Sequence, residues 1–161
     1  MIKPIVIALL ALLCAVFIRG YSAYMRRRRL ESRELLRLLE ILRKSMSTAI
    51  ATPRQAFSSV TATSPAVEGF RSLVCSGETL CDAFCKSQDG MSVSRACREM
   101  LSEYFASFGK GYLDDEIRCA DELIERYLAL VEREESADDN DIKVVKSIAV
   151  AITLGVIILI I

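Results

Sequence analysis

Cysteine is the residue type in this chain with the widest range of chemistry, and five of the six cysteines lie in its middle. Cys81 and Cys85 are four positions apart, so a helix would place both thiols on one face, where they could join Cys75 in a thiolate metal site. No Cys-x-x-Cys pair occurs, however, and cysteine is also a common small residue of protein cores. The sequence therefore favours core packing. Thiol-based redox or metal chemistry stays open as the alternative, with these candidates: Cys75, Cys81, Cys85, Cys97 and Cys119.

Carboxylates are concentrated late in the chain, where helix geometry explains them better than metal binding does. Asp114, Asp115 and Glu116 lie at a predicted helix start, and negative side chains there cap the helix and stabilise its positive end. The chain has no histidine, which removes the commonest general base and the commonest zinc nitrogen ligand. It also has no phosphate-binding loop and no nucleophile-elbow motif. We therefore expect a protein that is not an enzyme and that binds no cofactor and no metal.

Charge is distributed unevenly along the chain, although the formal net charge is zero. Residues 1–29 contain basic residues and no acid, whereas residues 30–143 contain an excess of acidic over basic residues. The basic segment, which includes Arg26, Arg27, Arg28 and Arg29, suits an anionic membrane surface. The acidic remainder argues against nucleic acid as a partner, because neutralising phosphates requires cations.

Apolar segments lie at both ends of the chain. The first, Pro4 to Ile18, extends with its flanks from Ile2 to Tyr24, close to the roughly 20 residues that a membrane-spanning helix needs. The second, residues 147–161, approaches that length only by starting near Val144, and anchoring at the membrane interface is its alternative. A secretory signal peptide would carry its positive charges before the apolar run, whereas most of them follow it here.

The order of charges also predicts an orientation. Basic residues follow the first apolar segment and precede the second, and such residues mark the cytoplasmic side of a membrane. The sequence thus predicts three parts: an N-terminal transmembrane anchor at residues 1–25, a cytoplasmic acidic domain at residues 26–141, and a C-terminal transmembrane anchor at residues 142–161.

The acidic domain is predicted to be a bundle of helices. Apolar residues recur every three or four positions, and no stretch alternates as a strand would. Helix starts are marked by Thr52-Pro53, with Gln55 completing a capping box, and by Ser64-Pro65, while Gly77 marks an end. The predicted helices cover residues 26–50, 53–62, 65–76, 78–87, 93–108 and 114–135. The first is interpreted as a core helix rather than a coiled coil with a second chain. The fold class is therefore all-α, a helical bundle flanked by two transmembrane helices.

Three short motifs lie in a fixed order between the predicted helices. They are Thr52-Pro53-Arg54-Gln55-Ala56-Phe57, Phe108-Gly109, and Gly111-Tyr112-Leu113-Asp114. Together with the apolar ends, the arginines and the long leucine-rich helix, this order resembles stage III sporulation protein AB of endospore-forming bacteria over essentially the whole chain. The chain departs from that family at Ile117, where glutamine is usual, and in lacking tryptophan. A contact that depends on the glutamine and the tryptophan of the family is therefore not expected in this chain.

The resemblance implies a function. The family is similar to the cytoplasmic domain of type II secretion F proteins, which are membrane platforms that work beside a secretion ATPase. It implies a scaffold subunit of the channel between mother cell and forespore, integral to the membrane, with its soluble domain in the mother-cell cytoplasm. The implied partners are the membrane, a cytoplasmic secretion-type ATPase and other sporulation channel proteins. A secretion or pilus assembly factor unrelated to sporulation is an alternative.

A partner surface is predicted from helical periodicity and charge. An acidic face steers a basic partner and speeds their encounter. The residues expected to be exposed on this face are Asp115, Glu116, Glu122, Glu125, Glu132 and Glu134. The sequence does not indicate the oligomeric state.

Overall fold

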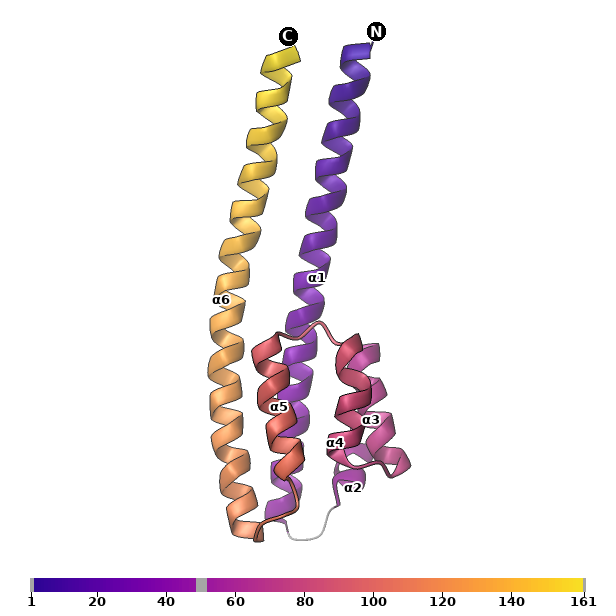
Figure 1. The fold of residues 1–161 in the computed structure, drawn as a ribbon, viewed down its shortest axis with the longest axis vertical. Coiled ribbons are helices and arrows are strands. Elements are labelled where there is room, and N and C mark those ends of the chain that lie inside the picture. Colours follow the sequence, from indigo (N-terminus) through magenta and orange to yellow (C-terminus); the bar gives the residue numbers. More distant parts are fainter. Residues whose placement is uncertain (1, 49–51, 161) are drawn as a thin grey trace. The chain divides into compact units, whose positions relative to one another are not determined.

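The computed structural model describes residues 2–48 and 52–160, with side chains for all of these except 2–7, 10, 157, 159 and 160 (Figure 1). These residues form helices and their connections, without a strand, so the all-α prediction is confirmed. The helices are α1 (Ile2–Ser47), α2 (Pro53–Ser58), α3 (Pro65–Ser76), α4 (Leu80–Ser87), the 3-10 turn η1 (Gln88–Gly90), α5 (Arg95–Ser107) and α6 (Leu113–Ile160). The predicted end of the first helix at Ile50 lies outside the described residues. Helix α6 is continuous through residues 132–141, beyond the predicted helix end at residue 135.

The prediction of flanking transmembrane helices is wrong for the described residues. Among these residues, neither α1, α6 nor any shorter helix contains an apolar stretch long enough to cross a membrane. The physical reason is visible in the sequence, because Arg19 ends the first uncharged run and Lys146 precedes the second. Each run is shorter than the roughly 20 residues that the hydrocarbon core of a bilayer requires.

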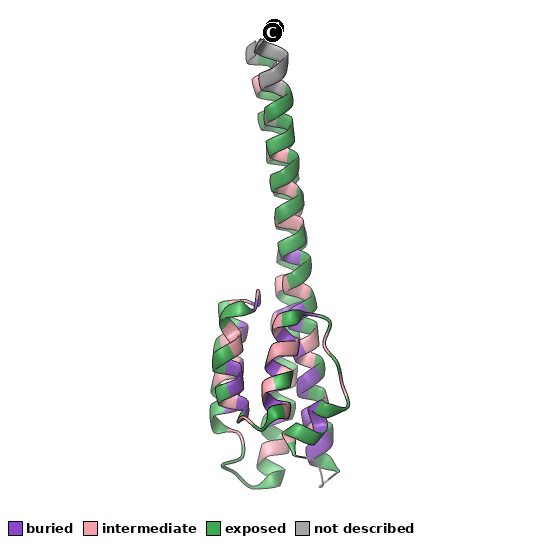
Figure 2. Ribbon diagram, turned by 90° about the vertical axis from the view of Figure 1, so that its right-hand side faces the viewer, coloured by how far each residue is buried: buried purple, intermediate pink, exposed green. Residues whose placement is uncertain are grey.

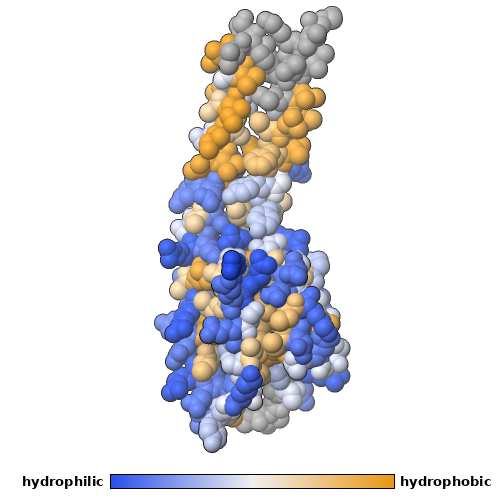
Figure 3. All heavy atoms as spheres, viewed as in Figure 1, coloured by the Kyte–Doolittle hydropathy of each residue, from blue (hydrophilic) through white to orange (hydrophobic). Residues whose placement is uncertain are grey.

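The chain divides into two compact units. Unit 1 contains residues 1–26 and 134–161, and unit 2 contains residues 27–133. The large apolar side chains of unit 1 are mostly exposed, and Figure 3 shows them in orange on α1 and α6, next to the grey chain ends. Unit 2 holds the buried core, which Figure 2 shows on the inward faces of its helices. The domain boundaries that the sequence predicts stay a prediction.

Phenylalanines from four helices meet in the core of unit 2. Phe70 of α3 is fully buried, and its ring lies 5.9 Å from Phe57 of α2, 5.7 Å from Phe84 of α4 and 5.5 Å from Phe105 of α5. Phe84 and Phe105 are themselves 5.2 Å apart. Edge-to-face and tilted ring pairs at these distances contribute beyond their buried area. These rings hold the short helices α2 to α5 together.

Two carboxylates of α1 fix two connecting segments to that helix. Glu31 is fully buried and accepts hydrogen bonds from Arg27 Nε (2.7 Å), from Ser64 Oγ (2.9 Å) and from the backbone N–H of Ser92. Glu34, one turn later, accepts from the backbone N–H groups of Thr63 (2.6 Å) and Ser64 (3.0 Å). The N–H groups of residues 63 and 64 thus bond to a side chain and not within a helix. This agrees with the end of α2 at Ser58, whereas the sequence predicted its end at Ala62. Glu34 is therefore half-buried and binds the connection before α3.

An ion pair joins α1 to α6 within unit 2. Arg43 donates through Nε to Asp121 Oδ1 (2.7 Å) and through Nη2 to Asp121 Oδ2 (3.0 Å), in the two-bond geometry that guanidinium and carboxylate groups favour. The hydrogen bond and the charge of Asp121 raise the pKa of Arg43. Asp121 is thus an acidic residue of α6 whose charge is already neutralised inside the domain.

The helix ends follow the predicted signals. Thr52 and Gln55 form the capping box at the start of α2, and Gly77 ends α3 with φ of 106°, in the left-handed region. The N–H groups of Gly77 and Glu78 bond back to Val74 O (3.1 Å) and Leu73 O (3.2 Å), as in a Schellman motif.

Gly77→Ala is expected to lower the free energy of unfolding by about 1 kcal/mol, because a side chain disfavours positive φ. Gly69→Ala is the matched control in the same helix, where an added Cβ meets nothing within 4 Å. This second change should stabilise by up to about 1 kcal/mol, because alanine is the better helix former. Urea unfolding of both variants measures the difference, and equal effects of the two changes would contradict the role of Gly77.

Candidate functional site

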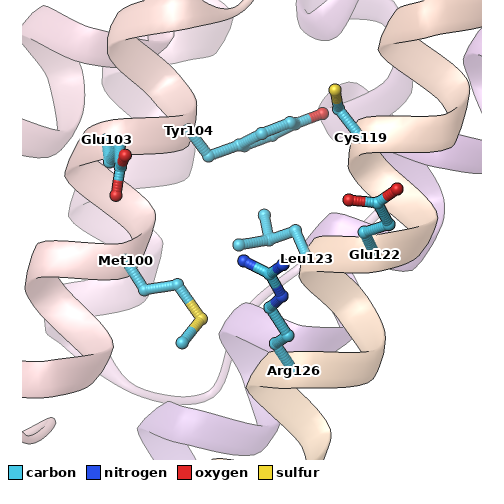
Figure 4. Close-up of a pocket in the computed structure, with 7 residues that line it drawn as sticks. All are labelled: Met100, Glu103, Tyr104, Cys119, Glu122, Leu123 and Arg126. Atoms are coloured by element: carbon cyan, nitrogen blue, oxygen red, sulfur yellow. The ribbon is translucent and has the colours of Figure 1, made fainter.

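A small cavity lies between α5 and α6 in unit 2 (Figure 4). Its volume is about 210 Å³. This is below the roughly 300–1,000 Å³ of pockets that enclose small-molecule ligands. Residues of α5 and of α6 line it at spacings of three and four, which place them on one face of each helix. The lining residues are Met100, Glu103, Tyr104, Cys119, Glu122, Leu123 and Arg126.

Tyr104 supplies a buried polar atom to this cavity. Its side chain is 7% exposed, and its hydroxyl is buried without a hydrogen-bond partner among the residues that the structure describes. In Figure 4 the ring points from α5 toward α6, with the hydroxyl near Cys119. Burial, with smaller effects of Glu116 and Cys119, raises the pKa of Tyr104, so its hydroxyl stays protonated and neutral at physiological pH. A buried tyrosine hydroxyl usually finds a partner, so this one is an unmet hydrogen-bonding group.

Three charged side chains surround the cavity opening. Glu103 of α5 and Glu122 and Arg126 of α6 are exposed. Within residues 2–48 and 52–160, none of the three side chains forms an ion pair that would neutralise its charge. The two carboxylates outnumber the guanidinium, so the opening carries net negative charge.

The structure distributes the predicted acidic residues among several roles. Asp115 pairs with Arg118 at 3.1 Å, and Glu116 accepts hydrogen bonds from the N–H groups of Gly109 (2.9 Å) and Gly111 (3.1 Å), which positions the turn before α6. Glu134 belongs to unit 1. The remaining three lie on α6 in unit 2 with exposed side chains: Glu122, Glu125 and Glu132. The predicted surface is thus narrower than the sequence indicated, and its contact with a partner stays a prediction.

Sequence reasoning missed the α5 side of this site. The apolar spacing of this helix places Met100 and Tyr104 on its inner face, and it gives no reason to single out Glu103. The available signal was the tyrosine itself, because its hydroxyl is a polar group on an otherwise apolar stripe and needs a partner. Periodicity within one helix does not show which residues of the next helix pack against it, so the pairing of α5 with α6 was not predicted.

Each of the four arginines predicted to face a membrane surface interacts within the chain. Arg27 pairs with Glu31 and also donates to Gly90 O at 3.0 Å, while Arg26 Nε donates to Ser22 O at 3.3 Å. Arg28 and Arg29 also interact within the chain. One of the four arginines predicted to face a membrane surface, Arg27, therefore helps to build the domain.

The cysteines do not converge. All six are free thiols; Cys97 is buried in the core, whereas Cys85 and Cys119 are exposed. Across the described parts of the chain, no cluster of three or more potential metal ligands occurs. Desolvation and the neighbouring Cys81 raise the pKa of the Cys85 thiol, which disfavours the reactive thiolate. Among these residues the structure therefore gives no support to a thiolate metal site, and the redox alternative stays a prediction.

A second hollow, of about 460 Å³, lies where two of the motifs meet. Thr52, Pro53 and Arg54 line it from the start of α2, and Phe108 lines it from the end of α5. Val74, Leu80 and Phe105 supply its other apolar walls. Motifs that are more than 50 positions apart in sequence thus shape one surface, which gives them a common structural role.

One comparison with known proteins gave a match, and it covers nearly the whole chain. The family model described as stage III sporulation protein AB matches residues 3–161. Comparison with curated proteins and with solved structures gave no significant match.

Proposed function

Because the chain belongs to the stage III sporulation protein AB family, which points to a role in stage III of sporulation, we propose that it is a non-enzymatic scaffold subunit. In this proposal the helical domain of unit 2 is presented to a cytoplasmic secretion-type ATPase and to other proteins of the channel between mother cell and forespore. The protein acts by holding partners in place, and no reaction is assigned to it.

The exposed acidic residues of α6 carry this proposal. Glu122, Glu125 and Glu132 have exposed carboxylates, whereas Asp115 and Asp121 are neutralised by arginines of the same chain. Carboxylates that form no ion pair within the domain can form one with a basic partner. They would speed the encounter and fix its orientation.

Association with a membrane is the second part of the proposal. Large apolar side chains near both chain ends are exposed, and an exposed apolar patch commonly marks a protein or membrane interaction site. They include Leu9, Leu12, Val16, Phe17, Ile148, Val150, Ile152 and Leu154. We propose that these segments hold the protein at the membrane, with unit 2 on the mother-cell cytoplasmic side.

Charge reversal of the acidic residues tests the proposed partner surface. The variant carries Glu122→Lys, Glu125→Lys and Glu132→Lys. In sporulating cells, crosslinking to the ATPase and channel proteins is expected to fall at least about tenfold, since like charges placed at an interface cost several kcal/mol. Spore yield should fall with it, and mass spectrometry of the crosslinked products measures the loss.

A matched control changes three exposed acids elsewhere in unit 2: Glu40→Lys, Asp89→Lys and Glu99→Lys. It alters the net charge by the same amount and should leave the crosslinks in place. Unchanged crosslinks in both variants, or crosslinked products without any secretion-type ATPase or channel protein, would refute the proposed function.

A further inference from the structure

We propose that the cavity between α5 and α6 receives one arginine side chain from a partner protein. This inference rests on the proposed function and specifies the place and the chemistry of the contact. Its starting point is the hydroxyl of Tyr104, which is buried at the cavity and has no hydrogen-bond partner among the described residues. A ligand that donates a hydrogen bond to this oxygen would satisfy it.

The charged groups at the opening favour a cationic donor. Glu103 and Glu122 approach the cavity from opposite helices, and both are acceptors only. A guanidinium group has five N–H donors in a flat fork, so it can bond to both carboxylates and to the tyrosine oxygen. An ammonium group has three donors and a tighter hydration shell, which makes lysine the poorer match.

The walls and the size of the cavity suit one long side chain. Met100 and Leu123 provide apolar surface on the two helices, against which the methylene stem of an arginine can pack. A volume of about 210 Å³ admits a side chain better than a folded segment or a metabolite. The occupant is therefore expected to be a single protruding residue on a basic surface.

Arg126 repels an arginine that enters the cavity, because both side chains are cations, and this repulsion can be used to test the proposal. It is the one cation among the lining residues, facing two carboxylates. Removing it should strengthen the binding of an arginine, whereas a site for an acidic partner would be weakened by the same change. The sign of this one effect separates the two chemistries.

The test uses the full-length protein in a mild detergent and the tripeptide acetyl-Gly-Arg-Gly-amide as the probe. The methyl carbons of methionine are labelled, so that the signal of Met100 reports the cavity while that of Met91, which is buried and does not line it, serves as reference. The arginine tripeptide is expected to shift the Met100 signal with saturation. The same peptide with citrulline, a neutral isostere, is expected to bind at least about tenfold more weakly, because its hydrogen bonds lack the charge.

Four variants localise the binding. Tyr104→Phe and Glu122→Gln should each weaken the tripeptide about five- to tenfold, and Arg126→Ala should strengthen it a few-fold. Glu99→Gln removes one negative charge from α5 outside the cavity and should leave the affinity within about twofold. Tyr104→Phe keeps the ring that packs against Phe105 and Phe108. The thermal unfolding temperature of this variant should therefore be equal to that of the unchanged protein, or higher.

The outcomes separate this inference from the proposed function. Equal binding of arginine and citrulline peptides, an unchanged affinity of Tyr104→Phe, or weaker binding to Arg126→Ala would each overturn the arginine site, whatever crosslinking in cells shows. If the tripeptide behaves as expected while the triple charge reversal leaves every crosslink unchanged, the arginine site stands and the proposed function fails.

Discussion

Glu31→Ala is expected to lower the free energy of unfolding by about 3 kcal/mol, a large share of the stability of a small domain. The buried carboxylate accepts three hydrogen bonds, and its removal leaves the hydroxyl of Ser64 and the backbone N–H of Ser92 without this acceptor. It also releases Arg27 from its ion pair. Urea unfolding of the full-length chain in detergent, followed by far-UV circular dichroism, measures the loss.

Two further variants make the Glu31 result specific. Glu31→Gln keeps the shape and one acceptor oxygen, so about half of the loss should return. Glu40→Ala changes an exposed glutamate of the same helix, and its effect should stay within about 0.5 kcal/mol. A loss below about 1 kcal/mol for Glu31→Ala, or a loss as large for Glu40→Ala, would show that the carboxylate does not fix the two connections.

Phe70→Ala should be at least as damaging, with a loss of about 4 kcal/mol. The ring is fully buried and contacts three others, so its removal leaves a cavity among α2, α3, α4 and α5 that these short helices cannot fill without moving. The same urea unfolding measures the loss. A fall in the slope of the transition would in addition show a less cooperative domain.

The matched control for Phe70 is Tyr112→Ala. Tyr112 is 85% exposed in the connection before α6, so this change removes a ring of similar size at nearly no cost, within about 0.5 kcal/mol. If the two aromatic substitutions gave similar losses, the phenylalanine cluster could not be what holds the short helices together.

Local signals in the sequence predicted the helices of unit 2 well. Hydroxyl residues before Pro53 and Pro65 and the glycine at position 77 act within a few residues, and the structure begins and ends helices beside them. The core stripe of α1 also follows from periodicity, since Leu35, Leu38, Leu39, Leu42 and Met46 are all buried. Such features depend on neighbours along the chain, which the sequence shows directly.

Features that depend on distant parts of the chain were not predicted. The roles of Glu31 and Glu34 in fixing the two connections were not predicted, because the backbone groups that they bind are 29 to 61 positions away. The cavity beside Tyr104 was not predicted either, because it depends on how α5 and α6 pack and not on the pattern within either helix. The transmembrane prediction failed for another reason: it depended on extending each apolar run across flanking charges, which the described helices do not support.

The partners of Glu31 also have a consequence for the order of events during synthesis. The helix that carries this residue leaves the ribosome first, yet Ser92 is made 61 positions later. At a synthesis rate of roughly 5–20 residues per second, the carboxylate waits about 3 to 12 s for that N–H group. During this interval water must solvate the carboxylate. The hydrogen bonds that fix the two connections to α1 are therefore completed only after Ser92 has been made.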